Sequence, residues 1–358
     1  MRFLNILLAL DSGAGNELAL ERAIRLARKE NARLTVCDVV DSVPGDYSRL
    51  ITAITPRELV DSIIADRLER IQSLLGTVDS SNLKIDTKVL VGRAHLEIAR
   101  LVREGHYDLV IKPIAGRRAT RARSVTREHR ELMRHCECPV WLVNVADLSK
   151  DRSIVAALDM PEDGAISTRL NERILQVARS IALATFRPLH VVHAWTLPGE
   201  GHLRARGSAK SDLEVNRMVA QEAADRMAWL RKAVYSSRSD DERIANKYLA
   251  PELHAAKGYP GNVVPELAER LGAGLIIMGT AARAGLRGML VGNTSEAVVS
   301  RTDSSLLIVK EPSSFSFLAT TGETASKSEH SRPDPAEPKF TRMSQPPRET
   351  GTLRVRNN

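Results

Sequence analysis

Cysteine is scarce in this chain of 358 residues, and long apolar runs are missing. The three cysteines, Cys37, Cys136 and Cys138, are too few for a disulfide framework, so a reducing compartment is the simpler expectation. No apolar stretch approaches the roughly 18 residues that a membrane span needs. We therefore expect a cytoplasmic protein with no membrane-spanning segment.

The charge balance is basic, which first suggests a nucleic-acid partner. Lys+Arg total 52 against 44 for Asp+Glu, which gives a net charge of +8. The concentrated excess lies in one segment that has no aromatic residue for base stacking. Its arginines are Arg117, Arg118, Arg121, Arg123, Arg127, Arg130 and Arg134. Because no zinc finger, RNP motif or basic zipper is present either, we expect no nucleic-acid partner.

The sequence contains an internal repeat of domain size. Three pairs of apolar segments match: residues 5–11 with 153–159, 107–112 with 273–278, and 139–143 with 305–309. The offset rises from 148 in the first pair to 166 in the others, so the second copy has about 18 additional residues. We place them between Trp195 and Val215, where glycine, serine and charged residues cluster. The repeat predicts two tandem domains, at residues 1–147 and 151–311.

Each copy alternates apolar strands with helical patterns. In the first copy we expect strands at residues 4–10, 33–40, 83–91, 108–112 and 139–144, and helices at 16–29, 56–75, 95–103 and 126–134. The second copy repeats this order from residue 154 to 310. The alternation predicts an α/β fold: two doubly wound, Rossmann-like domains, each a parallel sheet with helices on both faces. From residue 312 to 358, serine, threonine, proline and charges dominate, and we expect a disordered tail.

A glycine-containing loop in the second copy is the most informative motif. A strand expected to end at Met278 is followed by a loop containing Gly279 and Gly292, and then by a helix start near Asn293 or Thr294. Such a loop can bind phosphate, because backbone N–H groups and a helix N-terminus favour an anion. The loop is neither a Walker A motif nor a dinucleotide fingerprint, since it has no Gly-Lys-Ser/Thr and no G-x-G-x-x-G opening a helix.

This arrangement resembles the universal stress protein family, over about residues 3–310. Nucleotide-binding members carry Gly, two residues, Gly, nine residues, and Gly followed by Ser or Thr. In this chain Gly279 and Gly292 fit the first and third glycines, Ala282 stands at the second, and Asn293 replaces the usual Ser or Thr. The element order agrees in both copies, and Asp159 ends the first strand of the second copy. The resemblance implies an adenine nucleotide alpha hydrolase-like fold.

The resemblance also implies a nucleotide site in the second domain, for ATP with Mg or a nucleotide-like ligand. In ATP-binding members, the aspartate after the first strand contacts the base or ribose region. The residue just after the second strand gives backbone contacts to the base, and the loop with the following Ser or Thr holds the phosphates. The implied residues here are Asp159, Ala194, Met278, Gly279, Ala282, Arg283, Gly292, Asn293, Thr294 and Ser295. A Cβ at Ala282 narrows the loop, whereas Arg283 can add a charge-assisted phosphate contact.

The first copy has lost the loop pattern. At the positions of Gly279 and Gly292 it carries Pro113 and Thr126, and Pro113 offers no N–H to a phosphate. We predict that domain one binds no ATP and that Asp11 caps a turn or helix. By resemblance, family members often pair through their last strands. In this chain that pairing can be internal, and a further homodimer stays open.

We expect no metal site and no catalytic site. Cys136-x-Cys138 beside His135 has a one-residue spacing, whereas zinc sites use two to four. His190 and His193 are three apart on an expected strand, so they point to opposite faces. No nucleophile–base pair or paired carboxylate stands out.

Two functions from different classes follow. The first is a non-catalytic stress-response module that binds ATP or a nucleotide-like ligand in domain two. The second is a ligand-free scaffold that recruits an acidic partner through the arginine-rich face of domain one. Slow ATP hydrolysis is a weaker third hypothesis.

Overall fold

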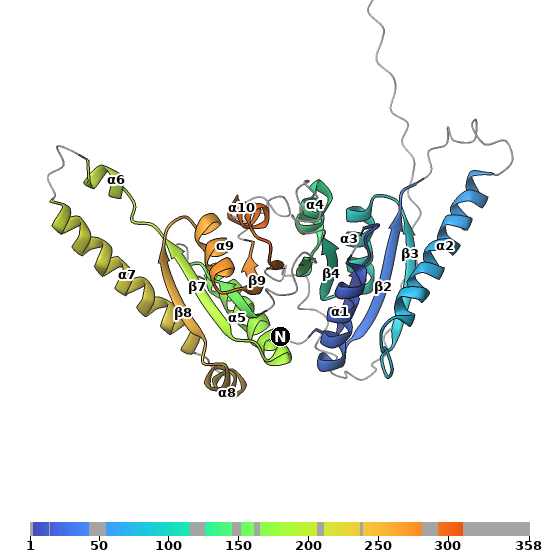
Figure 1. Cartoon of the computed structure of the whole chain (residues 1–358), viewed down its shortest axis with the longest axis horizontal. Helices are drawn as coiled ribbons and strands as arrows, with labels where there is room; N and C mark the ends of the chain where they lie inside the picture. Colours follow the sequence, from blue (N-terminus) through green and yellow to red (C-terminus); the bar gives the residue numbers. More distant parts are fainter. Residues whose placement is uncertain are drawn as a thin grey trace, which may run out of the picture. The chain divides into compact units, whose positions relative to one another are not determined.

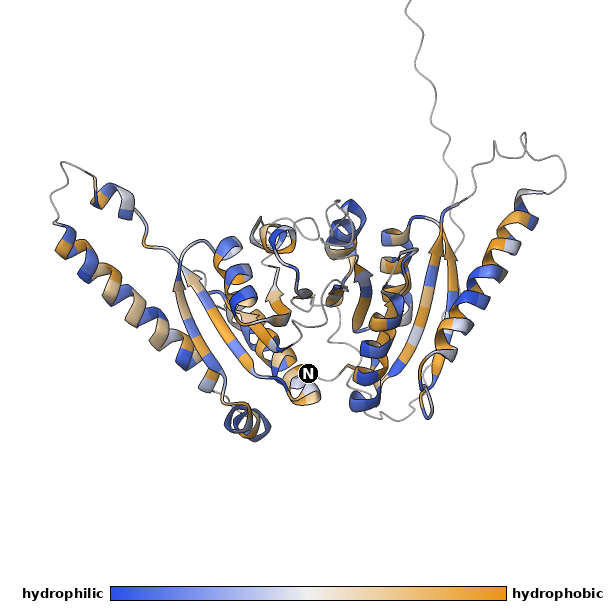
Figure 2. Cartoon of the chain, viewed as in Figure 1, coloured by the Kyte–Doolittle hydropathy of each residue, from blue (hydrophilic) through white to orange (hydrophobic). Residues whose placement is uncertain are grey.

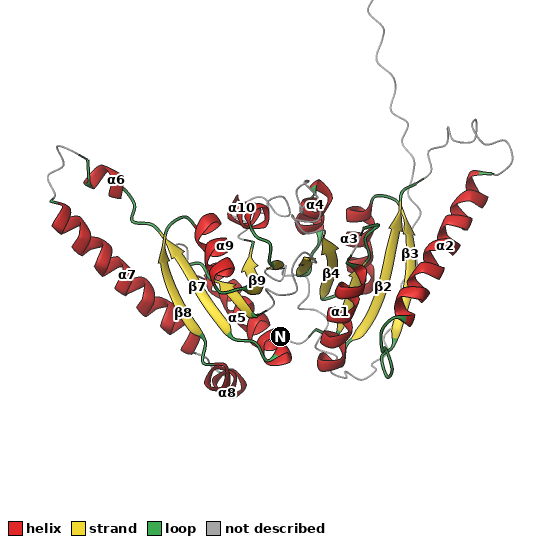
Figure 3. Cartoon of the chain, in the orientation of Figure 1, coloured by secondary structure: helices red, strands yellow, loops and turns green. Residues whose placement is uncertain are grey.

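One ten-stranded sheet with helices on both faces organises the chain (Figures 1 and 3). The structure is a computed structural model, and it describes residues 3–13, 15–42, 55–114, 126–144, 152–160, 165–205, 211–236, 239–280 and 293–310. The predicted tail at 312–358 lies outside these ranges. Among the described residues, no helix combines the length and apolarity that a membrane crossing requires.

The first half follows the predicted element order. Its strands are β1 (Asn5–Ala9), β2 (Arg33–Val40), β3 (Ile85–Val91), β4 (Leu109–Ile114) and β5 (Val140–Asn144). Its helices are α1 (Asn16–Glu30), α2 (Pro56–Gly76), α3 (Ala94–Gly105) and α4 (Arg127–His135). β4 and β5 are buried at every residue, and apart from Lys112 and Asn144 they are apolar, as is typical of strands covered on both faces.

In the described part of the chain, the second half repeats the order with two more helices. Its strands are β6 (Ser153–Ala157), β7 (Leu189–Trp195), β8 (Glu252–Lys257), β9 (Ala273–Gly279) and β10 (Ser305–Val309). Its helices are α5 (Ala165–Thr185), α6 (Glu200–Leu203), α7 (Asp212–Tyr235), α8 (Asp240–Leu249), α9 (Pro260–Arg270) and α10 (Asn293–Arg301). The doubly wound α/β class predicted for both copies is confirmed, whereas the predicted limits 1–147 and 151–311 stay predictions.

The additional residues of the second half do not lie where the sequence predicts them. The segment from β7 to α7 is about as long as the segment from β2 to α2, so the additional residues do not lie between Trp195 and Val215. Instead α5 has 21 residues where α1 has 15. The ten residues of α8 have no counterpart in the described part of the first half. Glycine, serine and charged residues did mark a loop, but composition does not distinguish an inserted loop from one that both halves share.

The two halves join through their last strands. The strand order is β3-β2-β1-β4-β5-β10-β9-β6-β7-β8, parallel within each half and antiparallel between β5 and β10. Across the junction, Leu307 is in register with Trp141, and at the repeat offset of 166 these two positions are equivalent. The register is therefore self-complementary, as an internal two-fold pairing requires. The predicted internal pairing of the last strands is confirmed.

Both faces of the sheet carry a core that continues across this junction. One cluster of buried side chains includes Ile111 and Trp141 of the first half with Ile277 and Leu307 of the second. The cluster on the other face likewise contains residues of both halves. Figure 2 shows the apolar colouring concentrated on the strands, while the helices also carry hydrophilic residues. The two halves thus share their hydrophobic interior.

Polar contacts add to this junction near α4. Arg134 Nη2 lies 2.9 Å from Glu296 Oε1 of α10. The Lys310 ammonium donates to the carbonyl oxygens of Arg134, at 3.4 Å, and of Cys136. Burial lowers the pKa of Lys310, and the two carbonyls at the end of α4 give its charge hydrogen-bond partners.

Candidate functional site at the carboxyl ends of the second-half strands

Three of the predicted site residues meet at one edge of the second half. Asp159 follows β6, Ala194 lies near the end of β7, and Gly279 is the last residue of β9. β6 pairs in parallel with both β7 and β9, so the carboxyl ends of all three strands are neighbours. The strand order reverses at β6, and ligands of open α/β sheets bind at such a switch point.

A buried asparagine holds the backbone of Asp159. Asn171 Nδ2 donates to the Asp159 carbonyl oxygen at 2.6 Å, and the Asp159 N–H donates to Asn171 Oδ1 at 3.2 Å. The same pair of bonds joins Asn16 to Asp11 in the first half, at 2.8 and 3.0 Å. The Asp159 residue is exposed, so these two hydrogen bonds fix its backbone while its side chain faces solvent. The sequence gives one signal for them, an asparagine in the following helix of each copy.

Ala194 is not the residue after the strand, as the sequence predicts, but the next-to-last residue of β7. Val192 O accepts from Leu158 N on the β6 side, and Trp195 O accepts from Gly258 N on the β8 side. Alternate residues of a parallel strand bond to opposite neighbours, so the backbone groups of Ala194 point toward β6. The β6–β7 register ends at Val192, so these groups lie beyond the last paired residue. Ala194 thus lies inside the strand, and the base contact that the resemblance implies for its backbone stays a prediction.

Met278 and Gly279 have structural roles at the end of β9. Met278 is 5% exposed and belongs to the core. A Cβ added at Gly279 would lie 2.6 Å from Leu170 Cδ2 and 3.2 Å from Ile174 Cδ1, both on α5. Such approaches are too short for carbon atoms, so the glycine permits the helix to pack closely on the strand end. The first glycine of the motif therefore has a packing reason of its own.

Substituting Gly279→Ala is expected to lower the free energy of unfolding by about 1–3 kcal/mol, because the new methyl group overpacks the contact with α5. Urea unfolding followed by circular dichroism measures the change. Adding Leu170→Ala should recover part of the loss, since it removes the atoms that the new methyl meets. Gly201→Ala is the matched control, because no atom lies within 4 Å of its added Cβ. A Gly279→Ala variant as stable as the wild type would contradict the close contact.

The start of α10 completes the described part of the site. The helix begins at Asn293, as predicted. Ser295 is 2% exposed, and its hydroxyl donates to the Gly279 carbonyl oxygen at 3.4 Å, which ties α10 to the end of β9. Thr294 is half-buried. Ala282, Arg283 and Gly292 lie outside the described residues, as does the side chain of Asn293.

The corresponding edge of the first half holds a buried ammonium group. Lys112 aligns with Met278 and is 3% exposed. Its Nζ donates to Leu10 O at 3.1 Å and lies 3.8 Å from Asp11 Oδ1. Asp11 therefore has an ion-pair partner in addition to the two hydrogen bonds between its backbone and Asn16. The absence of ATP binding in this domain stays a prediction.

A buried histidine lies beside this lysine, at the position aligned with Ser295. The Thr126 N–H donates to His129 Nδ1 at 3.1 Å, and the His129 N–H donates to Thr126 Oγ1 at 3.4 Å, so the pair caps α4. Burial, and after it the charge of Lys112, lowers the pKa of His129 to about 4. His129 is therefore a neutral capping residue at pH 7.

The arginine-rich segment is only partly described. Arg117, Arg118, Arg121 and Arg123 lie outside the described residues. Arg134 contacts Glu131 at 3.1 Å and Glu296 at 2.9 Å, so it serves the junction between the halves. Arg127 is exposed at the start of α4.

These features define a tandem pair of doubly wound α/β domains, and strand β9 of the second domain ends in Gly279. The model of the universal stress protein family matches residues 2–144 and 152–310, and the chain belongs to that family. It is 25% identical over 318 residues to the universal stress protein E homolog of Haemophilus influenzae, which covers 87% of this chain and 98% of that protein. It is 23% identical over 309 residues to universal stress protein E of Escherichia coli K12, which covers 86% of this chain and 93% of that protein.

Solved structures agree on the fold of both halves together. A protein of unknown function from Pseudomonas aeruginosa PAO1 superposes with a TM-score of 0.58 at 20% identity, covering 87% of this chain and 93% of that one. A universal stress protein from Archaeoglobus fulgidus gives a TM-score of 0.54 at 15% identity, covering 86% and 96%. The tandem arrangement is thus shared across the length of these relatives.

Proposed function

We propose that this chain is a non-catalytic, cytoplasmic stress-response regulator that binds ATP, with Mg²⁺, or a nucleotide-like ligand in its second domain. One observation carries the proposal: Asp159, the backbone of Ala194 and the start of α10 lie around one switch point of the sheet. The names of its relatives, universal stress protein E, support the stress-response role.

The residues at this edge fit the parts of a nucleotide. The exposed Asp159 can accept a hydrogen bond from a ribose hydroxyl. The backbone of Ala194, directed past the last paired residue of β6, can bond to a base edge. The N-terminus of α10 favours phosphate, and Thr294 can donate its hydroxyl there. Ser295 instead holds α10 to β9, so we give it a positioning role.

The test measures ATP binding by isothermal titration calorimetry with the full chain. We expect the wild type to bind, and we expect Asp159→Asn to weaken binding by about 10–100-fold, because a hydrogen bond to a charged group contributes about 1.5–3 kcal/mol. Asp11→Asn, the equivalent change in the first half, is the matched control and should leave binding unchanged. Gly292→Trp should abolish it.

A wild-type chain with no measurable nucleotide affinity would contradict the proposal, above all if mass spectrometry of the denatured protein also finds no copurified nucleotide. That result would favour the scaffold hypothesis, in which the arginine-rich face recruits an acidic partner. In that case Arg134 would contribute less to binding an acidic partner, because it already pairs with Glu131 and Glu296 within the molecule.

A further inference from the structure

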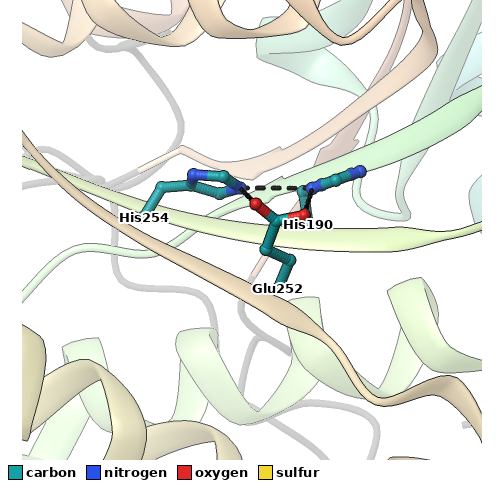
Figure 4. Close-up of side chains that lie close together, drawn as sticks. All are labelled: His190, Glu252 and His254. Carbon is teal, nitrogen blue, oxygen red and sulfur yellow. Dashed lines mark hydrogen bonds and ion pairs between the residues drawn. The ribbon is translucent and has the colours of Figure 1, made fainter.

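Three side chains of β7 and β8 converge at the amino ends of these strands (Figure 4). His190 is the second residue of β7, and it lies in register with Glu252, the first residue of β8. His254 is two residues further along β8, so it projects from the same face as Glu252. Within the described ranges, this is the only group of three or more His, Cys, Asp or Glu side chains close enough to share a metal ion.

The sequence predicts no partner for His190. His193 does lie on the opposite face, as expected, where its ring packs at a tilt against Trp229 of α7 with centroids 4.9 Å apart. The partner of His190 is instead His254, which enters from the adjacent strand 64 residues later. A cross-strand pair of this kind leaves no short-range spacing in the sequence.

The distances between the possible ligand atoms match a tetrahedral site. His190 Nδ1 lies 3.1 Å from His254 Nε2 and 3.4 Å from Glu252 Oε2. His254 Nε2 lies 3.8 Å from Glu252 Oε1. Ligands about 2.0–2.1 Å from a tetrahedral ion are separated by about 3.3–3.4 Å. The three observed separations fall on both sides of that value, so small side-chain adjustments would seat an ion among them.

Burial and charge also suit a cation here. The two imidazole side chains are 10% and 17% exposed, whereas Glu252 is 65% exposed at the rim. Imidazole rings bind metals through a ring nitrogen in their neutral form. The Glu252 carboxylate lies beside both rings and supplies a negative charge for a cation.

We propose that His190, Glu252 and His254 bind one divalent transition-metal ion, zinc by preference, with water as the fourth ligand. Two imidazoles and one carboxylate form a ligand set that zinc accepts, whereas calcium and magnesium require more oxygen ligands. The ion would fasten β8, the last strand in the sheet order, to β7. His190 is four residues before Ala194, so this site lies about 13 Å along the strand from the nucleotide edge.

Zinc binding to the full chain, without nucleotide and under reducing conditions, tests the proposal by competition with a chromogenic chelator. We expect one site per chain. His190→Gln and His254→Gln should each weaken zinc affinity by more than about 100-fold, since losing even an indirect partner of a metal ligand costs about 10–100-fold. Glu252→Gln should weaken it by at least about tenfold, and this exposed position leaves the fold intact. His202→Gln, at an exposed histidine of α6, and Asp159→Asn should change nothing.

Cobalt substitution identifies the ligands directly. Bound Co²⁺ should give a tetrahedral visible spectrum without a thiolate charge-transfer band, because no cysteine takes part. A thiolate band would assign the metal to Cys136 and Cys138, whose sulfur atoms are 3.5 Å apart, and would overturn the proposal. Absence of zinc binding by the wild type, or a zinc affinity equal to that of the wild type in Glu252→Gln or His254→Gln, would overturn it as well. The nucleotide proposal is independent of either result.

Discussion

Replacing Leu307 with alanine is expected to lower the free energy of unfolding by about 2–5 kcal/mol and to destabilise both halves together. Leu307 is fully buried, in register with Trp141 across the junction, and part of a core that contains residues of both halves. The cavity left by the missing methyl groups would therefore lie in a core that both halves share. A loss confined to the second half would require that each half have a separate core.

Tryptophan fluorescence can follow the two halves separately during urea unfolding. Trp141 is the single tryptophan of the first half, and Trp195 and Trp229 belong to the second. In a background with phenylalanine at both second-half positions, fluorescence reports the first half, and its midpoint should shift with Leu307→Ala as far as the circular dichroism midpoint does. Leu213→Ala, at a side chain 61% exposed, is the control and should stay within about 0.5 kcal/mol of the wild type. An unmoved Trp141 transition would show that the halves unfold independently.

His129 is expected to make stability fall as the pH falls from about 6.5 to about 4. The folded-state pKa of His129 is about 4, below the unfolded value of 6.5. Between these values the unfolded chain takes up a proton that the folded chain excludes, so protonation favours unfolding. The contribution of neutral His129 to the free energy of unfolding is fully present above pH 6.5. It falls by about 1.4 kcal/mol per pH unit below that, so the loss reaches about 3 kcal/mol by pH 4.

Urea unfolding of wild type and His129→Gln at pH 7.5 and pH 4.5 isolates this contribution. The stability lost between the two pH values should be about 2–3 kcal/mol smaller in the variant, because glutamine takes up no proton. His202→Gln removes an exposed histidine and should lose as much as the wild type. Equal losses in wild type and His129→Gln would contradict the buried neutral state of His129.

The element order was predictable because covered parallel strands are nearly continuous apolar runs. The strand at residues 33–40 has the predicted bounds, and the other first-half strands begin and end within two residues of them. The repeat predicted the pairing of the last strands, but the register that sets Leu307 opposite Trp141 depends on contacts between distant segments. Hydrophobic periodicity is a property of one segment at a time. It therefore predicts the bounds of strands and helices better than the register between strands.

The parts of the candidate site that a local sequence motif specifies could be predicted. Asp159 at the end of β6 and the start of α10 at Asn293 both follow from a strand end or a helix start. The hydrogen bonds from Asn171 to the Asp159 backbone were not predicted. The reason is that α5 is longer than α1, so this asparagine is displaced from the position expected from Asn16. The steric reason for Gly279 was missed because it depends on Leu170, which is more than 100 residues earlier in the chain.

The antiparallel joint between β5 and β10 lies within a single polypeptide, and this frees its two sides from having to be identical. Two identical chains meeting about a two-fold axis must make each contact twice, because equivalent positions on the two sides carry the same residue. Here Lys310 bonds the end of α4, while the aligned residue, Asn144, donates its backbone N–H to Ser305 Oγ at 3.1 Å. Covalent linkage also makes the association of the halves independent of dilution. A duplicated chain of this kind allows the two sides of the joint to carry different residues and to diverge independently.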